Sequence, residues 1–434
     1  MYKKGGTSAK KINLFILFCS QFALSLQQTI KSMTMKIAIY TLTSGLHDEA
    51  TVGHANKEFL GNLGVEYDLC GSNFTDYGSH VLDVIYVCTG GTEGIFRRLL
   101  PELRSRTSRP FYLLASGQSN SLAASIEILS FLRQKGVAGE IIHGSPDYVS
   151  ARLQLLARVG EARAWLNGKR LGVIGQPSDW LIASHADKEA LSCQLGLQLV
   201  DVEIQQLLDE ISFLQEQTSD LQTLCDTDNE VVRTSLPGAL RIYQALLRIV
   251  EKYRLDGLTI RCFDLLTAVH NTGCLALARL NAEGLVAGCE GDVPAMVSMM
   301  VARALTGVSG FQANPASINP ETGEMMLAHC TIPLDMVSHY EFDTHFESGI
   351  GVGIRGYMDA GPVTIFKVAG NLSRHYVAEG TLLRCEARRD LCRTQFVIQL
   401  DIPTQTSYFL TNPIGNHHIV IPGHQKALIE ALLE

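Results

Sequence analysis

Short apolar runs alternate with longer stretches of helical periodicity between residues 36 and 307. The short runs are rich in Val, Ile and Leu and predict buried strands over 36–41, 81–88, 110–115, 170–175, 197–203, 258–262 and 286–289. The helical periodicity predicts helices over 55–63, 95–104, 121–134, 204–216, 226–253, 274–281 and 295–305. Pro237 marks a point where the longest of these helices can break. Strands that alternate with helices are typical of βαβ units and parallel sheets.

The pattern changes after Gly307, where strand-like runs follow one another without long helical stretches between them. Gly, Pro and Asn turns separate runs over 311–314, 325–330, 340–345, 363–368, 375–385, 395–400 and 419–421. This pattern is typical of an antiparallel, β-rich domain. A short helix is expected over 425–433, at the end of the chain.

These patterns predict an α/β fold with two Rossmann-like α/β domains, each with a parallel sheet, and a C-terminal β-rich, barrel-like domain. The turn at residues 167–169 (Asn-Gly-Lys) marks the expected boundary between the two α/β domains. The predicted parts are an N-terminal extension over 1–34, α/β domains over 35–168 and 169–309, and the β-rich domain over 310–434.

The N-terminal extension differs from the rest of the chain. Four lysines precede an apolar run over 12–26 that resembles a signal peptide, but no clear cleavage site follows it. Met35 directly precedes the first predicted strand and is the expected natural start of the protein. The eleven cysteines are odd in number and form no CxxC pair, which favours reduced thiols and a cytoplasmic location.

Composition narrows the classes of partner. Hydrophobic residues make up 46% of the chain and charged residues 18%, which is typical of a globular protein with a large core. The net charge of −8 does not favour a nucleic-acid surface, and no later segment is expected to span a membrane. We therefore expect a small molecule as the partner.

Two glycine-rich loops, 89–94 and 116–120, follow predicted strands and open onto predicted helices. Such loops can bind anions through free N–H groups, but neither matches GxGxxG or a phosphate-loop motif. Tight turns that need glycine explain them equally well, so a nucleotide-dependent α/β enzyme remains a minor alternative.

The stretch over 286–297 holds the most informative chemistry. Glu290 and Asp292 follow the predicted strand at 286–289, and Pro294 suits the first turn of the next helix. In α/β sheets this edge is where ligands bind, and a divalent cation could compensate two carboxylates there. The alternative interpretation is structural, with Asp292 as a helix N-cap and Glu290 favouring the helix dipole.

Other donors join these carboxylates in an oxygen-rich set with histidine. Asp264 follows the predicted strand at 258–262, and His417 lies close to the C-terminus. Two carboxylates and one imidazole suit Mn²⁺ or Mg²⁺. The chain contains neither GxSxG nor HExxH, which disfavours nucleophilic hydrolysis and a zinc protease site.

In this order the motifs resemble those of the L-fucose isomerase and L-arabinose isomerase superfamily, over residues 36–434. The acidic motif at 289–292 (Cys-Glu-Gly-Asp) precedes Ala-Leu-Thr-Gly at 304–307. Gly-Asn-His-His at 415–418 is followed by Gly-His at 423–424. The segment 170–180 is also similar to members of this group. The resemblance implies a homotrimer or homohexamer of chains with two α/β domains and a β-barrel-like domain.

The resemblance also implies an activity, namely aldose–ketose isomerisation through an ene-diol intermediate with Mn²⁺, or another divalent cation such as Mg²⁺. It places Asp292 and His417 on metal positions. The upstream glutamate of L-fucose isomerases has no counterpart over 277–281, so Asp264 is the expected substitute and Glu290 the second choice. Asp264 and Asp292 would also carry the proton between C1 and C2.

Substrate contacts are expected from Glu290, Asn416 and Trp180, although Trp180 near a strand end can equally be a packing residue. The chain is shorter than classical L-fucose isomerases, so the identity of the sugar does not follow from the resemblance. The missing glutamate supports one alternative, a non-catalytic sugar-binding or regulatory paralogue of the same fold.

Overall fold

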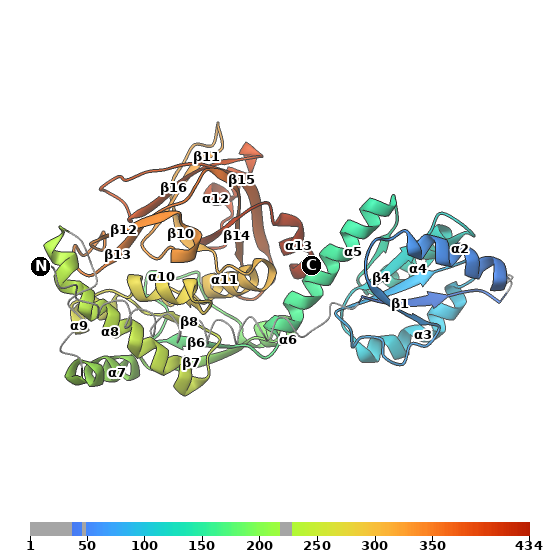
Figure 1. The fold of residues 1–434 in the computed structure, drawn as a ribbon, viewed down its shortest axis with the longest axis horizontal. Coiled ribbons are helices and arrows are strands. Elements are labelled where there is room, and N and C mark those ends of the chain that lie inside the picture. The colour runs from blue at the N-terminus through green and yellow to red at the C-terminus, as the bar shows by residue number, and fades with distance from the viewer. Residues whose placement is uncertain (1–36, 46–48, 218–227) are drawn as a thin grey trace, which may run out of the picture. The chain divides into compact units, whose positions relative to one another are not determined.

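The computed structural model describes residues 37–45, 49–217 and 228–434, so the N-terminal extension predicted over 1–34 lies outside the described residues. The chain divides into two compact units, one that ends at Ala164 and one from Trp165 to Glu434 (Figure 1). The boundary predicted at residue 168 falls close to this division, and that predicted at residue 309 falls inside the second unit.

The first unit is a doubly wound α/β structure. Its parallel sheet has the order β2-β1-β3-β4-β5 and consists of β1 (Ile37–Leu42), β2 (Tyr67–Gly71), β3 (Leu82–Val87), β4 (Phe111–Ala115) and β5 (Gly139–Ile142). Its helices are α2 (Glu49–Gly61), α3 (Glu93–Arg106), α4 (Ser121–Gln134) and α5 (Pro146–Leu166).

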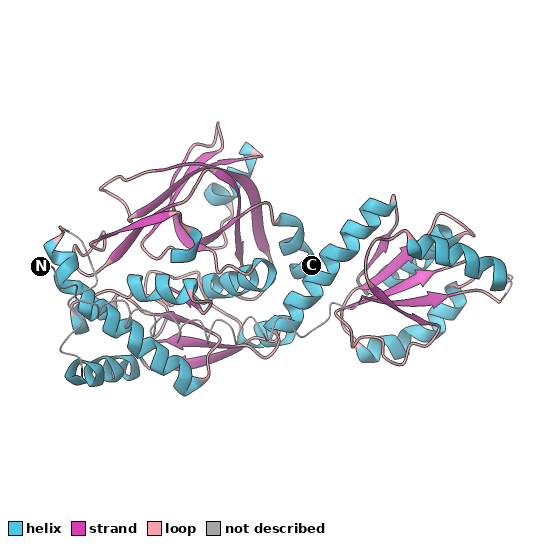
Figure 2. Cartoon of the chain, in the orientation of Figure 1, coloured by secondary structure: helices cyan, strands magenta, loops and turns pink. Residues whose placement is uncertain are grey.

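Side chains along β1 point alternately to the two faces of the sheet, and each face has its own hydrophobic cluster. Ile37 and Ile39 join one hydrophobic cluster with residues of α2 and α5, whereas Ala38 and Tyr40 join a second with residues of α3 and α4. The sheet therefore carries helices on both faces (Figure 2). The pattern analysis missed β2 and β5, which are short edge strands with partly buried side chains and a weaker apolar signal.

The second unit contains another parallel sheet. Its order is β7-β6-β8-β9, with β6 (Arg170–Ile174), β7 (Gln198–Val202), β8 (Gly257–Ile260) and β9 (Val286–Gly288). Its helices are α6 (Lys188–Leu195), α7 (Ile204–Gln217), α8 (Glu230–Tyr253), α9 (Asp264–Val269), α10 (Cys274–Ala282) and α11 (Val293–Thr306). Helix α8 starts at the Asn229 N-cap and continues through Pro237, so the break considered there does not occur.

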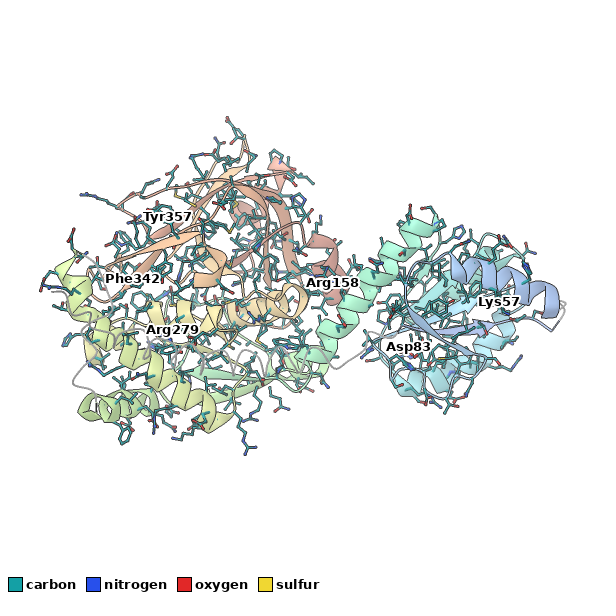
Figure 3. The ribbon with its side chains drawn as sticks, in the orientation of Figure 1. Lys57, Asp83, Arg158, Arg279, Phe342 and Tyr357 are labelled. Atoms are coloured by element: carbon teal, nitrogen blue, oxygen red, sulfur yellow. The ribbon has the colours of Figure 1, made fainter. Side chains whose placement is uncertain are left out.

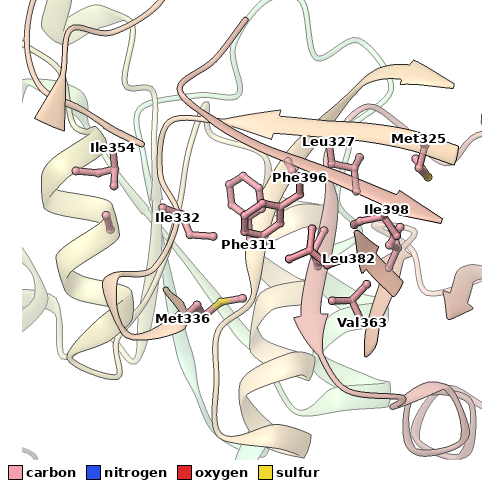
Figure 4. Packing of buried hydrophobic residues seen from close by; sticks show 14 of the residues in the cluster. Phe311, Met325, Leu327, Ile332, Met336, Ile354, Val363, Leu382, Phe396 and Ile398 are labelled. Atoms are coloured by element: carbon pink, nitrogen blue, oxygen red, sulfur yellow. The ribbon is translucent and has the colours of Figure 1, made fainter. Parts of the chain in front are cut away.

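The C-terminal strands close into an antiparallel barrel with the order β10-β11-β16-β15-β14-β17. Its strands are β10 (Phe311–Ile318), β11 (Glu324–His329), β14 (Gly361–Val368), β15 (His375–Cys385), β16 (Thr394–Leu400) and β17 (His418–Pro422). Phe311 and Phe396 pack in its core with ring centroids 5.1 Å apart, beside Leu382 and Ile398 (Figure 4). The predicted fold class is thus confirmed.

Several short elements complete this part of the chain. β12 (His339–Asp343) and β13 (Gly353–Tyr357) form a separate two-stranded sheet, of which only β12 was predicted. The remaining elements are η1 (Leu334–Met336), η2 (Pro403–Thr406), α12 (Ser407–Thr411) and α13 (Lys426–Leu433).

Helices α10 and α11 lie between the four-stranded sheet and the barrel (Figure 1). Helix α11 contacts β8 and β9 as well as β10, β14 and β17, which explains why almost all its residues are apolar and buried. On α10, Arg279 (Figure 3) contacts α8, where its guanidinium lies 4.2 Å from the ring centroid of Tyr243. Helix α11 therefore packs against both the sheet and the barrel, directly after the acidic loop that precedes it.

Within the described ranges, no helix combines the length and apolarity that crossing a membrane requires.

Candidate metal and sugar site

Glycine geometry shapes the acidic loop between β9 and α11. Gly291 has φ +70°, and its N–H donates to the carbonyl of Ile260 at 2.8 Å. Glu290 also has a positive φ, +63°, which is strained for a residue with a side chain, and its carbonyl accepts from Ser178 N at 2.9 Å. The ends of β6, β8 and β9 are therefore tied together around Glu290, at the carboxyl edge of the sheet.

The Glu290 carboxylate is buried among three nitrogen atoms. Trp180 Nε1 donates to its Oε2 at 2.7 Å, and its Oε1 lies 3.4 Å from His417 Nε2 and 3.6 Å from His329 Nε2. Burial alone would raise the pKa of Glu290, but its interactions with the His329 and His417 imidazoles outweigh burial and hold the pKa well below its usual range. Glu290 is therefore an ionised carboxylate that is held in one orientation.

Glu290, His329 and His417 each present one donor atom, and these atoms lie within 4.8 Å of one another. All three residues are buried. His417 Nε2 is buried without a hydrogen-bond partner, an arrangement that a metal ion would satisfy. One carboxylate oxygen and two imidazole nitrogens fit a divalent transition metal.

Asp292 lies behind His417 rather than in this group. Its Oδ2 accepts a 2.8 Å hydrogen bond from His417 Nδ1 and lies 3.5 Å from Lys367 Nζ, while its Oδ1 accepts from Ala295 N. Burial opposes ionisation of Asp292, but the Lys367 charge and the His417 hydrogen bond keep its pKa well below the usual range. Asp292 therefore both caps α11 and orients His417, as carboxylates behind metal-binding histidines commonly do.

His329 is the member of the group that sequence analysis missed. It ends β11, and its Nδ1 lies 3.0 Å from Thr331 Oγ1, which turns Nε2 toward Glu290. Burial lowers the pKa of His329, which keeps the imidazole neutral. A single histidine at the end of an apolar strand belongs to no spaced motif, so only its position at the strand end could have drawn attention to it.

The structure does not bring Asp264 into the group. Its carboxylate lies 3.1 Å from Arg261 Nε, and Arg261 also binds Asp179 at 2.9 Å. Asp264 thus belongs to an ion pair that anchors the loop before Trp180, and its metal and proton-transfer roles remain predictions without structural support. The Asn416 carbonyl lies 2.9 Å from His418 Nδ1, and its side chain is exposed.

A pocket opens beside Glu290 and His329. Phe263, Asn314, His345 and Glu347 are among its other lining residues. Trp180 is 52% exposed. Its ring packs edge-on against that of Phe263, with ring centroids 4.7 Å apart. The Phe263 ring packs edge-on against that of His345, with ring centroids 5.6 Å apart. Aromatic faces beside polar groups are suited to a sugar ring.

Replacing Gly291 by alanine should destabilise the protein by about 2–4 kcal/mol. The new Cβ would lie 2.7 Å from the Gln176 carbonyl oxygen and 2.8 Å from Pro177 Cα, and the backbone there has a positive φ. Urea unfolding would measure the loss. Gly349→Ala is the matched control, because Gly349 has φ +68° but no atom within 4 Å, so it should cost about 1 kcal/mol. Equal losses for the two variants would contradict the close contact.

Metal affinity should rise with pH. Burial alone would lower the pKa of His417, but Asp292 and Glu290 raise it to about 9 in the metal-free protein. Below that pH a metal must displace a proton from His417, so Mn²⁺ affinity should increase about tenfold per pH unit between about pH 6.5 and 8.5. Calorimetric titrations at several pH values would measure the slope, and a flat profile would contradict this expectation.

No family model matches the chain. It is 24% identical over 265 residues to the sulfoquinovose isomerases of Priestia megaterium and Priestia aryabhattai, a region that covers 58% of this chain and 59% of each relative. It is 26% identical over 202 residues to the sulfoquinovose isomerase of a Clostridium species, which is 44% of both chains. The chain thus matches less than two thirds of the length of these curated relatives, and over that part it is similar to sugar isomerases.

Proposed function

We propose that this protein is a metal-dependent aldose–ketose isomerase that acts on a sugar. The observation that carries the proposal is the buried Glu290–His329–His417 group, in which His417 Nε2 makes no hydrogen bond, beside a pocket with aromatic and polar walls. The similarity to sulfoquinovose isomerases supports the same reaction class. The resemblance of the acidic and histidine motifs to L-fucose isomerases is in accord with both.

The donor set favours a transition metal over Mg²⁺. Two of the three donors are imidazole nitrogens, whereas Mg²⁺ prefers oxygen ligands. Mn²⁺ is therefore the proposed cofactor. When bound, such an ion would polarise two neighbouring oxygens of the open-chain sugar.

The residues around the group have distinct proposed roles. Trp180 holds the Glu290 carboxylate through its indole N–H, and Asp292 fixes the His417 ring so that Nε2 faces the group. Glu347 lines the pocket, and no described residue donates a hydrogen bond to its carboxylate. Burial and, after it, the charge of Glu290 raise the pKa of Glu347, which suits a group that takes a proton from C2 and returns it to C1.

The relatives support a choice of first substrates. Because they are sulfoquinovose isomerases, a hexose with a sulfonate group is the first substrate to examine, and L-fucose is the second. Assembly as a homotrimer or homohexamer and a cytoplasmic location stay predictions from the resemblance and from the thiol content.

The test is ketose formation from sulfoquinovose, L-fucose and L-arabinose by the chelator-treated protein, with and without Mn²⁺, followed by NMR. We expect product only with the metal, and less product with Mg²⁺. Tight sugar binding with no ketose under any condition would favour the non-catalytic paralogue. Failure of Mn²⁺ to bind at saturating concentration would overturn the proposal.

A further inference from the structure

Cysteine side chains gather in the wall of the same pocket, and the proposed reaction does not use them. Nine cysteines lie in the described residues, all as free thiols. Five of these line the pocket beside Glu290 and His329, namely Cys262, Cys274, Cys289, Cys330 and Cys392. Two of the five, Cys289 and Cys330, directly adjoin Glu290 and His329 in the chain.

The side chains of Cys262 and Cys289 are in direct contact. Their sulfur atoms are 3.0 Å apart, about 1 Å longer than a disulfide bond. They follow the ends of β8 and β9, which are paired in register from Gly257↔Val286 to Thr259↔Gly288. The neighbouring strands therefore hold the two sulfurs together, and bond formation needs only a small movement.

We propose that Cys262 and Cys289 form an oxidative modification site, at which a peroxide produces a disulfide that disables the adjoining metal group. One thiol attacks hydrogen peroxide to give a sulfenic acid and water. The second thiol then displaces water from the sulfenic acid and closes the disulfide. Two electrons pass to the peroxide, both thiol protons end in water, and a dithiol reductant reverses the change.

Either thiol of this pair can attack the peroxide, because the other sulfur lies 3.0 Å away and can then close the disulfide. The pocket gives a small oxidant a route to the pair, since both residues line it.

Because Cys289 and Glu290 are adjacent in the chain, a movement of Cys289 would also displace Glu290. The Cys289 N–H donates to Gln312 Oε1 at 2.8 Å, and the Glu290 carbonyl accepts from Ser178 N at 2.9 Å. Closing the disulfide strains both anchors and shifts the carboxylate, and a displacement of about 1 Å is worth about 100-fold in activity. This consequence rests on the proposed function.

The test treats the full chain with hydrogen peroxide and measures two quantities, the disulfide by peptide mass mapping and Mn²⁺ affinity by calorimetry. The variant Cys262→Ala removes the pair, and Cys193→Ala removes an exposed thiol on α6 as the matched control. Each protein is compared with its own reduced form.

We expect a Cys262–Cys289 disulfide in wild type and in Cys193→Ala, with an Mn²⁺ affinity at least about tenfold weaker that dithiothreitol restores. Cys262→Ala should keep its affinity after treatment. A disulfide at other cysteines, or this disulfide with unchanged affinity, would overturn the inference. If the reduced protein binds no Mn²⁺, the proposed function fails, while the mass mapping still decides whether the modification occurs.

Discussion

Replacing Glu290 by glutamine should weaken Mn²⁺ binding by more than about 100-fold and reduce ketose formation to background. Glu290 is the carboxylate of the proposed metal group, and its Oε1 lies 3.4 Å and 3.6 Å from the two histidine nitrogens. Glutamine has the same shape and keeps an oxygen for Trp180 Nε1, so the fold should be retained. Calorimetric Mn²⁺ titration and circular dichroism would separate lost binding from lost structure.

Glu347→Gln is the matched control for this variant, because Glu347 lines the same pocket without joining the metal group. It should retain Mn²⁺ affinity within about threefold while turnover falls by about 100-fold or more, as expected for a proton carrier. If Glu290→Gln binds Mn²⁺ as tightly as Glu347→Gln does, the assignment of Glu290 as a ligand is wrong.

Replacing Asp292 by asparagine should destabilise the protein by about 3–5 kcal/mol and weaken Mn²⁺ binding by about 10–100-fold. Asp292 and Lys367 are fully buried and 3.5 Å apart, so asparagine leaves a buried ammonium group without its counter-charge. Asparagine can still cap α11, but it no longer accepts a charge-assisted hydrogen bond from His417 Nδ1. Denaturant unfolding and metal titration would measure the two effects.

The double variant Asp292→Asn with Lys367→Met distinguishes the two roles. Removing both charges should recover much of the stability, because no unpaired charge remains buried. It should not recover Mn²⁺ affinity, since His417 still lacks its orienting carboxylate. Strictly additive stability losses would show that the pair is not coupled and would refute this account of Asp292.

Local pattern was enough to predict the fold class. The alternation of apolar runs and helical stretches up to residue 307 corresponds to two parallel sheets, and the turn-separated runs after it correspond to the closed barrel. Hydrophobic periodicity reports which face of each element is buried, and that information is carried by neighbours in the chain. The edge strands β2 and β5 were not predicted, because their side chains are only partly buried and give a weaker apolar pattern.

By itself the sequence determined that acidic residues stand at a strand end before a helix, and that a histidine motif lies near the C-terminus. Only the tertiary structure decided which donors converge. Packing of the barrel against α11 brings His329 and His417 to Glu290, and the positive φ of Glu290 and Gly291 directs Glu290 into the pocket while Asp292 lies behind His417. These relations join residues up to 127 positions apart, from Glu290 to His417, and local periodicity carries no information about such contacts.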